Sequence, residues 1–387
     1  MKTIAIICEY NPFHAGHLRQ ISLVREIFGE DAVILSLMSG NYVQRGEMAL
    51  YPKYTRARSA LACGVDLVLE LPYPWSCGSA AFFARGAVSV LCDLGCVDHL
   101  VFGCEDRTLP ELEQYIRRTA SPEFAARLDA RRDGREGSMS DIRLVSETYR
   151  SLYGEDVPTR ANDILAAEYL RALYGMRQSK DPKCAVSPYA IRREGPWSAT
   201  AIRQSLRRGD DPSDAIPSGA LQVLQSAAMP DLSAASAAAL GYFRLTPPSV
   251  YVNCDGAGGG MAHRIARQAM QCTSLERLYT ALRCKTSTDA AIRRTVWHCL
   301  FGTERDDLRN CPAFVTVLAA SASGMQLLHR ARRTSRIPVL TRPAAWRNLD
   351  GYARRQGEQS ARADAFYALA MGWESGHDLR EKPVLLS

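Results

Sequence analysis

Two histidines separated by three residues, His14 and His17, are the side chains of this sequence most suited to chemistry. They follow the apolar run at residues 3–7, which predicts a buried strand, a turn and a helix that begins near the histidines. A helix N-terminus presents unpaired N–H groups and partial positive charge, and Gly16 lets the backbone approach a bulky anion. This combination favours binding of a nucleotide polyphosphate. A pair of metal ligands and a purely structural turn are the alternatives.

Short apolar runs recur after the histidines and alternate with stretches of helical spacing. This alternation predicts parallel βαβ units, and an open parallel sheet binds its ligands beyond the carboxyl ends of its strands. The strands are expected at residues 3–7, 33–38, 66–71 and 98–102. The loops that would line one crevice contain His14, Gly40-Asn41, Pro72 and Gly103. The predicted fold class is therefore α/β, with a Rossmann-like parallel sheet.

The pattern changes along the chain in a way that predicts two domains. A helical insertion is expected at about residues 109–173, followed by a further strand near residues 184–191. Beyond residue 207 the chain is rich in Ala, Ser, Leu and Arg at helical spacing. We therefore divide it into a parallel-sheet domain, residues 1–207, and a mainly α-helical domain, residues 208–387.

Hydroxyl groups and an arginine mark the start of the last helix in the first domain. Ser198 and Thr200 are followed by Arg203, which places two donors and a cation around one point. Such a set can stabilise a leaving pyrophosphate, and the alternative is an ordinary N-cap with a surface arginine. The polar segment at residues 40–47, followed by Lys53, could serve the same crevice or form a solvated face.

Positive charge gathers in the second domain, although the net charge of the chain is only +7. Between residues 330 and 355 eight arginines stand against one acid, Asp350, and Trp346 and Tyr352 lie among them. Aromatic rings between cations suit stacking on unpaired RNA bases, while a solvated charged face is the alternative. The candidate RNA-binding residues are Lys285, Arg293, Arg294, Arg332 and Arg333.

Composition excludes several classes of protein. With 47% apolar and 23% charged residues, the chain is typical of a globular protein. No apolar run approaches the roughly 20 residues of a spanning helix and no signal region is evident, so we expect a cytoplasmic protein without a membrane partner. The twelve cysteines lack paired metal-binding spacing and are expected to be buried and reduced. No dedicated metal site is predicted, and residue order leaves the oligomeric state open.

Taken together, the motifs resemble those of a known family. The sequence is similar to the bacterial tRNA(Met) cytidine acetate ligases, members of the nucleotidyltransferase superfamily that carry an H-x-G-H motif. The similar segments are residues 9–17, 39–47, 53–57, 64–72, 102–105 and 198–203. They match the family in order and spacing over about the first 205 residues. The second half matches more loosely, because Lys285-Thr286-Ser287-Thr288 stands where the family shows a Lys-Arg-Tyr-Thr-like segment.

The resemblance implies an enzyme that uses ATP to activate acetate as acetyl-adenylate and passes the acetyl group to N4 of the wobble cytidine of elongator tRNA(Met). Mg²⁺ would accompany the phosphates, and His14, His17 and Arg203 would act by positioning and charge neutralisation. The ATP contacts carried over from the family are Ile7, Cys8, Glu9, Tyr10, Asn11, Pro12, Phe13, His14, Gly16, His17, Gln20, Gly103, Asn162 and an arginine at Arg192 or Arg193. The hydroxyl-bearing Ser198 and Thr200 join this set.

Three functions compete at this point. The favoured one is the RNA-acetylating ligase, the second an adenylyltransferase that joins AMP to a small phosphorylated metabolite, and the third a nucleotide-dependent RNA-binding module without chemistry. The long arginine-rich second half favours the first over the second, because a small metabolite does not require it. Intact His14, Gly16 and His17 argue against the third.

Overall fold

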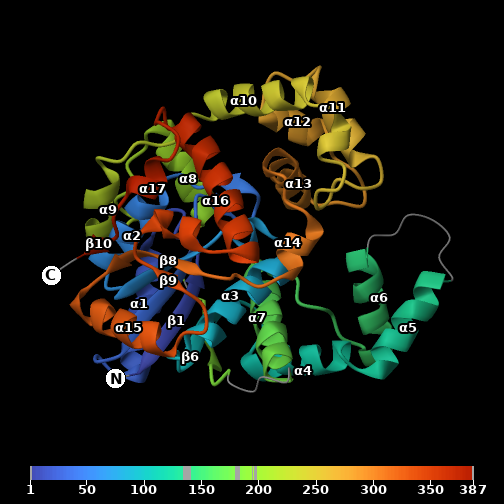
Figure 1. Ribbon diagram of the computed structural model, residues 1–387. Coiled ribbons are helices and arrows are strands. Elements are labelled where there is room, and N and C mark those ends of the chain that lie inside the picture. The colour runs from blue at the N-terminus through green and yellow to red at the C-terminus, as the bar shows by residue number, and fades with distance from the viewer. Residues whose placement is uncertain (1, 134–140, 179–183, 194, 196–197, 386–387) are drawn as a thin grey trace.

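A central sheet organises the part of the chain that the computed structural model describes, namely residues 2–133, 141–178, 184–193, 195 and 198–385 (Figure 1). In these residues the sheet has eight strands in the order β10-β8-β5-β2-β1-β6-β7, with β9 beside β8. The strands from the first half are β1 (Thr3–Cys8), β2 (Val33–Ser39), β5 (Leu67–Leu71), β6 (His99–Cys104) and β7 (Ser187–Arg192). They pair in parallel, as the sequence predicts.

Continuous apolar sequence explains why these strands occupy the centre. Every residue of β2 is buried, as expected for a parallel strand that is covered on both faces. Ile4 and Ile6 of β1 pack toward one layer of helices, and Ala5 packs toward the other. The first layer includes α1 (Ala15–Phe28) and α2 (Lys53–Ala62), and the second includes α3 (Ala80–Leu94), α7 (Ala161–Gln178) and α15 (Ala322–Thr334).

The expected helical insertion is present between β6 and β7. It consists of α4 (Leu109–Thr119), α5 (Pro122–Asp133) and α6 (Asp141–Tyr153), followed by α7. Helices α5 and α6 contact each other and stand out from the sheet (Figure 1). By contrast, α7 packs on α3, so the insertion returns to the sheet layer before β7.

The second half is mainly helical, as predicted, and has its own apolar core. A short hairpin from the first half, β3 (Tyr42–Val43) and β4 (Glu47–Met48), packs into that core. The helices are α8 (Ala199–Arg208), α9 (Ser218–Leu224), α10 (Leu232–Leu245), α11 (Met261–Ala269), α12 (Leu275–Ala281), α13 (Asp289–Phe301), α14 (Arg305–Arg309), α16 (Gly351–Ala370) and α17 (His377–Arg380). Turns of 3₁₀ helix lie at Trp75–Cys77, Pro248–Val250 and Pro343–Asn348.

After α14 the chain returns to the central sheet, which the division at residue 207 does not anticipate. Strand β8 (Val315–Ala320) is fully buried and pairs antiparallel with β5, and β9 (Val339–Leu340) and β10 (Val384–Leu385) pair with β8. The apolar run of β8 covers the edge of β5, which would otherwise expose unpaired backbone groups. The two halves therefore share one sheet.

The prediction that the cysteines are reduced is wrong for one pair. Cys92 of α3 and Cys184, which lies just before β7, form a disulfide. The two residues are 92 positions apart in sequence, so only the tertiary fold brings them together. Elsewhere in the described ranges, the free cysteines are buried except Cys284 and Cys311, which are partly exposed. No helix among these residues combines the length and apolar character needed to span a membrane.

Candidate active site

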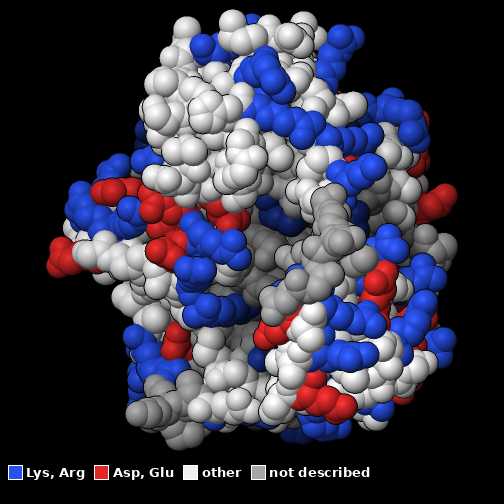
Figure 2. All heavy atoms as spheres, turned by 90° about the vertical axis from the view of Figure 1, so that its right-hand side faces the viewer, with Lys and Arg blue, Asp and Glu red and all other residues white. Residues whose placement is uncertain are grey.

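A cavity of about 690 Å³ opens at the carboxyl ends of β1, β6 and β7. Its walls are the turn before α1, the first turns of α1 and α7, the end of β7 and the start of α8. The predicted residues that line it are Ile7, Cys8, Glu9, His14, Gly16, His17, Gln20, Gly103, Asn162, Arg192, Arg193, Ser198, Thr200 and Arg203. Figure 2 shows the molecule hollowed between the α10–α13 segment above and α4–α6 below, with Lys and Arg side chains around the hollow.

The two histidines form the N-terminal cap of α1. The backbone N–H of Gly16 donates to His14 Nδ1 at 3.1 Å, and the backbone N–H of His14 donates to His17 Nδ1 at 3.2 Å. The two rings stack with centroids 3.8 Å apart. Because each Nδ1 accepts a hydrogen bond, each neutral ring carries its proton on Nε2. Both histidines can therefore donate from Nε2.

Burial keeps both imidazoles neutral. It lowers the pKa of His14 to about 4, with a further contribution from the nearby Arg193 cation. Burial also lowers the pKa of His17 well below its usual value, and His14 and Arg193 add to this effect. Near pH 7 the histidines are thus neutral hydrogen-bond donors next to a helix N-terminus, which is an arrangement suited to phosphate oxygens.

Four of the residues predicted to contact ATP do not line this cavity. They stabilise the turn that carries the histidines. Tyr10 and Phe13 are buried, and the Tyr10 hydroxyl is 2.8 Å from Ser36 Oγ. Asn11 Oδ1 accepts the backbone N–H of Leu50 at 2.7 Å. The remaining residue of the four is the cis proline Pro12. The sequence motif therefore includes both lining residues and the residues that fix the turn.

The loops at Gly40 and Pro72 also differ from expectation, since both are buried and neither lines the cavity. The carbonyl oxygen of Gly40 accepts a hydrogen bond from the buried Arg56 guanidinium. Lys53 is likewise buried, where its Nζ is 2.9 Å from Glu70 Oε1 and 2.6 Å from an oxygen of Asp364. Arg56 and Lys53 therefore bind other parts of the protein, and neither lines the cavity.

The opposite wall is fixed by a carboxylate that sequence reasoning missed as a site-building residue. Asp163, at the start of α7, accepts the backbone N–H groups of Glu105 and Asp106 at 2.7 and 3.0 Å. Glu105 Oε2 in turn accepts the backbone N–H of Asn162 at 3.1 Å. This reciprocal bracket holds the end of β6, with Gly103, against Asn162. The available signal was the polar pair Asn162-Asp163 in front of a stretch with helical spacing.

Arg203 closes the cavity from α8. Its guanidinium donates to the carbonyl oxygen of Asn11 at 3.0 Å and to Thr200 Oγ1 at 3.3 Å. Ser198 Oγ caps α8 by accepting the backbone N–H of Ala201. Ser198, Thr200 and Arg203 thus all line the cavity, and Ser198 is at the same time the N-cap of α8. Arg203 is buried, so burial lowers its pKa.

The remaining lining residues come from the polar segment at residues 40–47, for which a role in this crevice was one of two interpretations, and from apolar core positions. Gln44 and Arg45 reach the cavity from the hairpin loop, and the backbone N–H of Gln44 donates to Glu9 Oε1 at 2.9 Å. Burial raises the pKa of Glu9. The apolar lining is supplied by Leu23, Phe83, Phe102, Ile164, Leu165 and Tyr169. Ordinary core spacing gives no sign that such residues face a cavity.

Known proteins with similar sequences identify the family. The HIGH Nucleotidyl Transferase family model matches residues 1–381. A tRNA(Met) cytidine acetate ligase of Halothermothrix orenii is 32% identical, over 88% of this chain and 87% of the relative. This chain belongs to the tRNA(Met) cytidine acetate ligase family. The family predicted from the motifs is thus confirmed.

Further members and solved structures agree with this family. The tRNA(Met) cytidine acetate ligase of Syntrophotalea carbinolica is 32% identical, over 88% of this chain and 85% of the relative. Thermotoga maritima TmcAL bound with alpha-thio ATP matches 100% of both chains with a TM-score of 0.90 at 26% identity. The apo form of the same protein also matches with a TM-score of 0.90.

The candidate tRNA-binding residues of this family member fall into separate places. Helices α13 and α15 lie on different sides of the molecule in Figure 1. In α13, Arg293 binds Glu47 of β4 and Arg294 binds the carbonyl oxygen of Gln44, whereas Lys285 is exposed just before that helix. Arg332 and Arg333 are exposed on α15. Other arginines of the cluster at residues 330–355 bind protein groups, for example Arg355 with Asp307.

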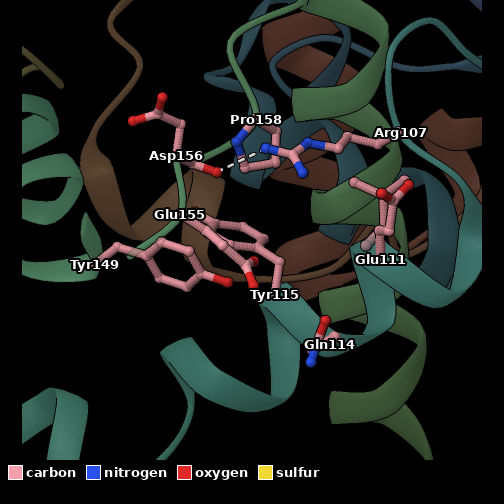
Figure 3. Close-up of a pocket in the computed structure, with 9 residues that line it drawn as sticks. Arg107, Glu111, Gln114, Tyr115, Tyr149, Glu155, Asp156 and Pro158 are labelled. Atoms are coloured by element: carbon pink, nitrogen blue, oxygen red, sulfur yellow. Dashed lines mark hydrogen bonds between the residues drawn. The ribbon is translucent and has the colours of Figure 1, made fainter. Parts of the chain in front are cut away.

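A second, smaller pocket lies in the helical insertion and shares no lining residue with the cavity. Its volume is about 130 Å³, and Arg107 donates across it to the carbonyl oxygen of Asp156 at 2.8 Å (Figure 3). The rings of Tyr115 and Tyr149 lie side by side with centroids 5.2 Å apart. His14, His17 and Arg203 line the larger cavity and not this pocket.

Proposed function

We propose that this protein uses ATP to activate acetate as acetyl-adenylate and transfers the acetyl group to N4 of the wobble cytidine of elongator tRNA(Met). The observation that carries this proposal is the pair of neutral histidines at the N-terminus of α1, which face one cavity together with Arg203. The family supplies the acceptor, since its named relatives are tRNA(Met) cytidine acetate ligases.

In the first step, an acetate oxygen attacks the α-phosphorus of ATP and pyrophosphate leaves in line. Acetate is already a competent nucleophile, so positioning and charge neutralisation are sufficient. The Nε2–H groups of His14 and His17 and the helix N-terminus would bind phosphate oxygens. Arg203 would stabilise the charge that develops on the leaving pyrophosphate.

In the second step, the cytidine amine attacks the acyl carbon of acetyl-adenylate. A C–N bond forms, the bond from the acyl carbon to the phosphate oxygen breaks, and AMP leaves with the electron pair. The amine loses one proton during this step. Positioning of the cytidine beside the adenylate is the main requirement on the protein, because the mixed anhydride is already activated.

ATP would enter as its Mg²⁺ complex, so the ion belongs to the substrate. Among the described residues that line the cavity, the carboxylates are Glu9 and Glu105, and each accepts a backbone N–H group. Both carboxylates are engaged by backbone groups, and in this proposal phosphate oxygens hold the ion. The protein contributes donors and cations to the opposite side of the phosphates.

The tRNA would approach the hollowed face and place its wobble base in the cavity. Lys285 remains our predicted tRNA contact beside α13, and Arg332 and Arg333 on α15 would bind a more distant part of the tRNA backbone. Arg293 and Arg294 were predicted for the same role, but their contacts with the hairpin favour a structural one. An enzyme with this substrate would act in the cytoplasm.

Incubation with ATP, radiolabelled acetate and total tRNA tests the proposal. We expect label in RNA that yields N4-acetylcytidine on nuclease digestion, and no label when ATP or tRNA is omitted. AMP transfer to a small phosphorylated metabolite without acetate would favour the adenylyltransferase alternative. A protein that binds ATP and tRNA but forms neither product would contradict both enzymatic functions.

A further inference from the structure

The hairpin loop between β3 and β4 joins the cavity to the second half of the chain. On the cavity side, the backbone N–H of Gln44 donates to Glu9 Oε1, and Glu47 Oε2 is 3.3 Å from Arg203 Nη2. On the other side, Glu47 Oε1 accepts from Arg293 Nη1 at 2.8 Å. The single carboxylate of Glu47 therefore contacts one arginine of the cavity and one arginine of α13.

Helix α13 holds this loop along its backbone as well. Arg294 Nη1 donates to the carbonyl oxygen of Gln44, and Trp297 Nε1 donates to that of Gly46, both at 2.9 Å. Gly46 has a φ of +70°, and a Cβ there would lie 2.7 Å from Arg293 Cβ and 2.8 Å from the backbone nitrogen of Arg294. Only glycine suits this position, both for its backbone angle and for the close approach of α13.

Glu47 is well placed to control the guanidinium of Arg203. The arginine is buried, and Glu47 is the charged group that contributes most to offsetting the effect of burial on its pKa. Glu47 itself is only partly buried, with its side chain 30% exposed. Its two carboxylate oxygens are directed to different partners, one to Arg203 at the cavity and one to Arg293 on α13.

We propose that Glu47 is a positioning residue that holds Arg203 over the cavity and makes this position depend on α13. Arg203 also binds the carbonyl oxygen of Asn11 in the histidine turn. The chain of contacts therefore runs from α13 through Glu47 and Arg203 to the turn that carries His14. The inference rests on the proposed function, since Arg203 is expected to stabilise the leaving pyrophosphate.

Acetate-dependent exchange of pyrophosphate into ATP, measured without tRNA, tests this role. For Glu47→Gln we expect kcat to fall about 10-fold or more with the KM for ATP within about twofold of wild type, because a contact needed in the transition state is displaced. Arg293→Ala leaves the contact between Glu47 and Arg203 in place and should lower kcat by a smaller factor. Asp289→Asn alters an exposed ion pair between the first residue of α13 and Arg283, which precedes that helix; it is the matched control and should exchange like wild type.

A double-mutant cycle separates positioning from general stability. In the Arg203→Ala background, Glu47→Gln should change kcat by less than about twofold, because its effect passes through Arg203. Two outcomes would overturn the inference and leave the proposed function intact. In the first, the losses of the two single variants multiply in the double variant. In the second, Glu47→Gln exchanges like wild type while Arg203→Ala is defective. Thermal unfolding of each variant ensures that kcat refers to folded protein. A wild-type protein without acetate-dependent exchange would overturn the proposed function, and this inference with it.

Discussion

The histidine turn and the arginine-rich second half differ in how far away in the sequence the bonding partners of their side chains lie. His14 and His17 are fixed by hydrogen bonds to backbone groups at most three residues away. Arg293 and Arg355 are fixed by Glu47 and Asp307, which lie far from them in sequence. A compact motif can therefore be interpreted from the sequence, whereas a run of arginines cannot be assigned to solvent, RNA or protein before its partners are known.

The same contrast extends to charge. The histidine turn buries titratable groups in their neutral form, and its donors are uncharged near pH 7. Where the second half packs against the first, a buried cation and several carboxylates lie together instead. Lys53 is paired there with Glu70 and Asp364, and Asp378 lies close to them through Asn41. We therefore expect a fall in pH to lower the free energy of unfolding through the histidine turn, and a rise in pH to lower it through the second half.

The largest effect is expected from His17→Ala. Loss of one neutral donor at the proposed phosphate site should lower acetate-dependent pyrophosphate exchange by about 100-fold to 1,000-fold. His263→Ala, on the exposed face of α11, serves as a control for histidine removal and should behave like wild type. Exchange by His17→Ala at the wild-type rate would mean that the histidine turn is structural only.

The next effect concerns stability in mild acid. The pKa of His14 is lowered from 6.5 to about 4, so the folded state binds fewer protons than the unfolded state between these values. The resulting stability is present above pH 6.5 and is lost as pH falls toward 4, by about 3 kcal/mol in the free energy of unfolding. His14→Asn keeps an N-cap acceptor and removes the titrating ring, so it should lose correspondingly less.

Urea unfolding at pH 7 and pH 4.5 measures this difference. If wild type and His14→Asn lose the same free energy of unfolding between the two pH values, His14 is not the source of the acid destabilisation. Lys285→Ala provides a control, because it removes an exposed side chain outside the cavity.

A smaller effect of opposite sign is expected from the second half. Burial and the nearby Asp364 raise the pKa of Asp378 from 3.8 to about 7. Stability from its neutral form is therefore present below pH 3.8 and is lost as pH rises through 7. Asp378→Asn retains an oxygen acceptor for Asn41 and should be more stable than wild type at pH 8, by about 2 kcal/mol. Equal unfolding curves at pH 8 would show that Lys53 already compensates this carboxylate.

The smallest effects are expected for single exposed cations in tRNA binding. Lys285→Ala should weaken tRNA binding about threefold and reduce the slope of log affinity against log salt by about one. Arg332→Ala and Arg333→Ala should each have a smaller effect, because α15 lies away from the hollowed face (Figure 1). Filter binding across a salt series measures these changes. A larger loss from the α15 variants would move the main tRNA contact to that side.

Much of the α/β half could be predicted because its signals are local. Five parallel strands lie within a few residues of the expected ranges, since apolar runs between turns mark them directly. Strand β8 was missed because its partner β5 lies far away in sequence and its alanines suit a helix equally well. The Cys92–Cys184 disulfide escaped for the same reason.

The sequence by itself determined the strand-turn-helix of residues 3–28, the histidine pair and the family to which they point. These depend on backbone geometry and on neighbours a few positions away. The tertiary structure alone decided that Tyr10 and Phe13 are buried beneath the histidine turn. It also decided that Asp163 holds the end of β6 against α7, and that Glu47 joins Arg203 to α13. The physical reason is that burial and ion pairing depend on which distant segments the fold brings together.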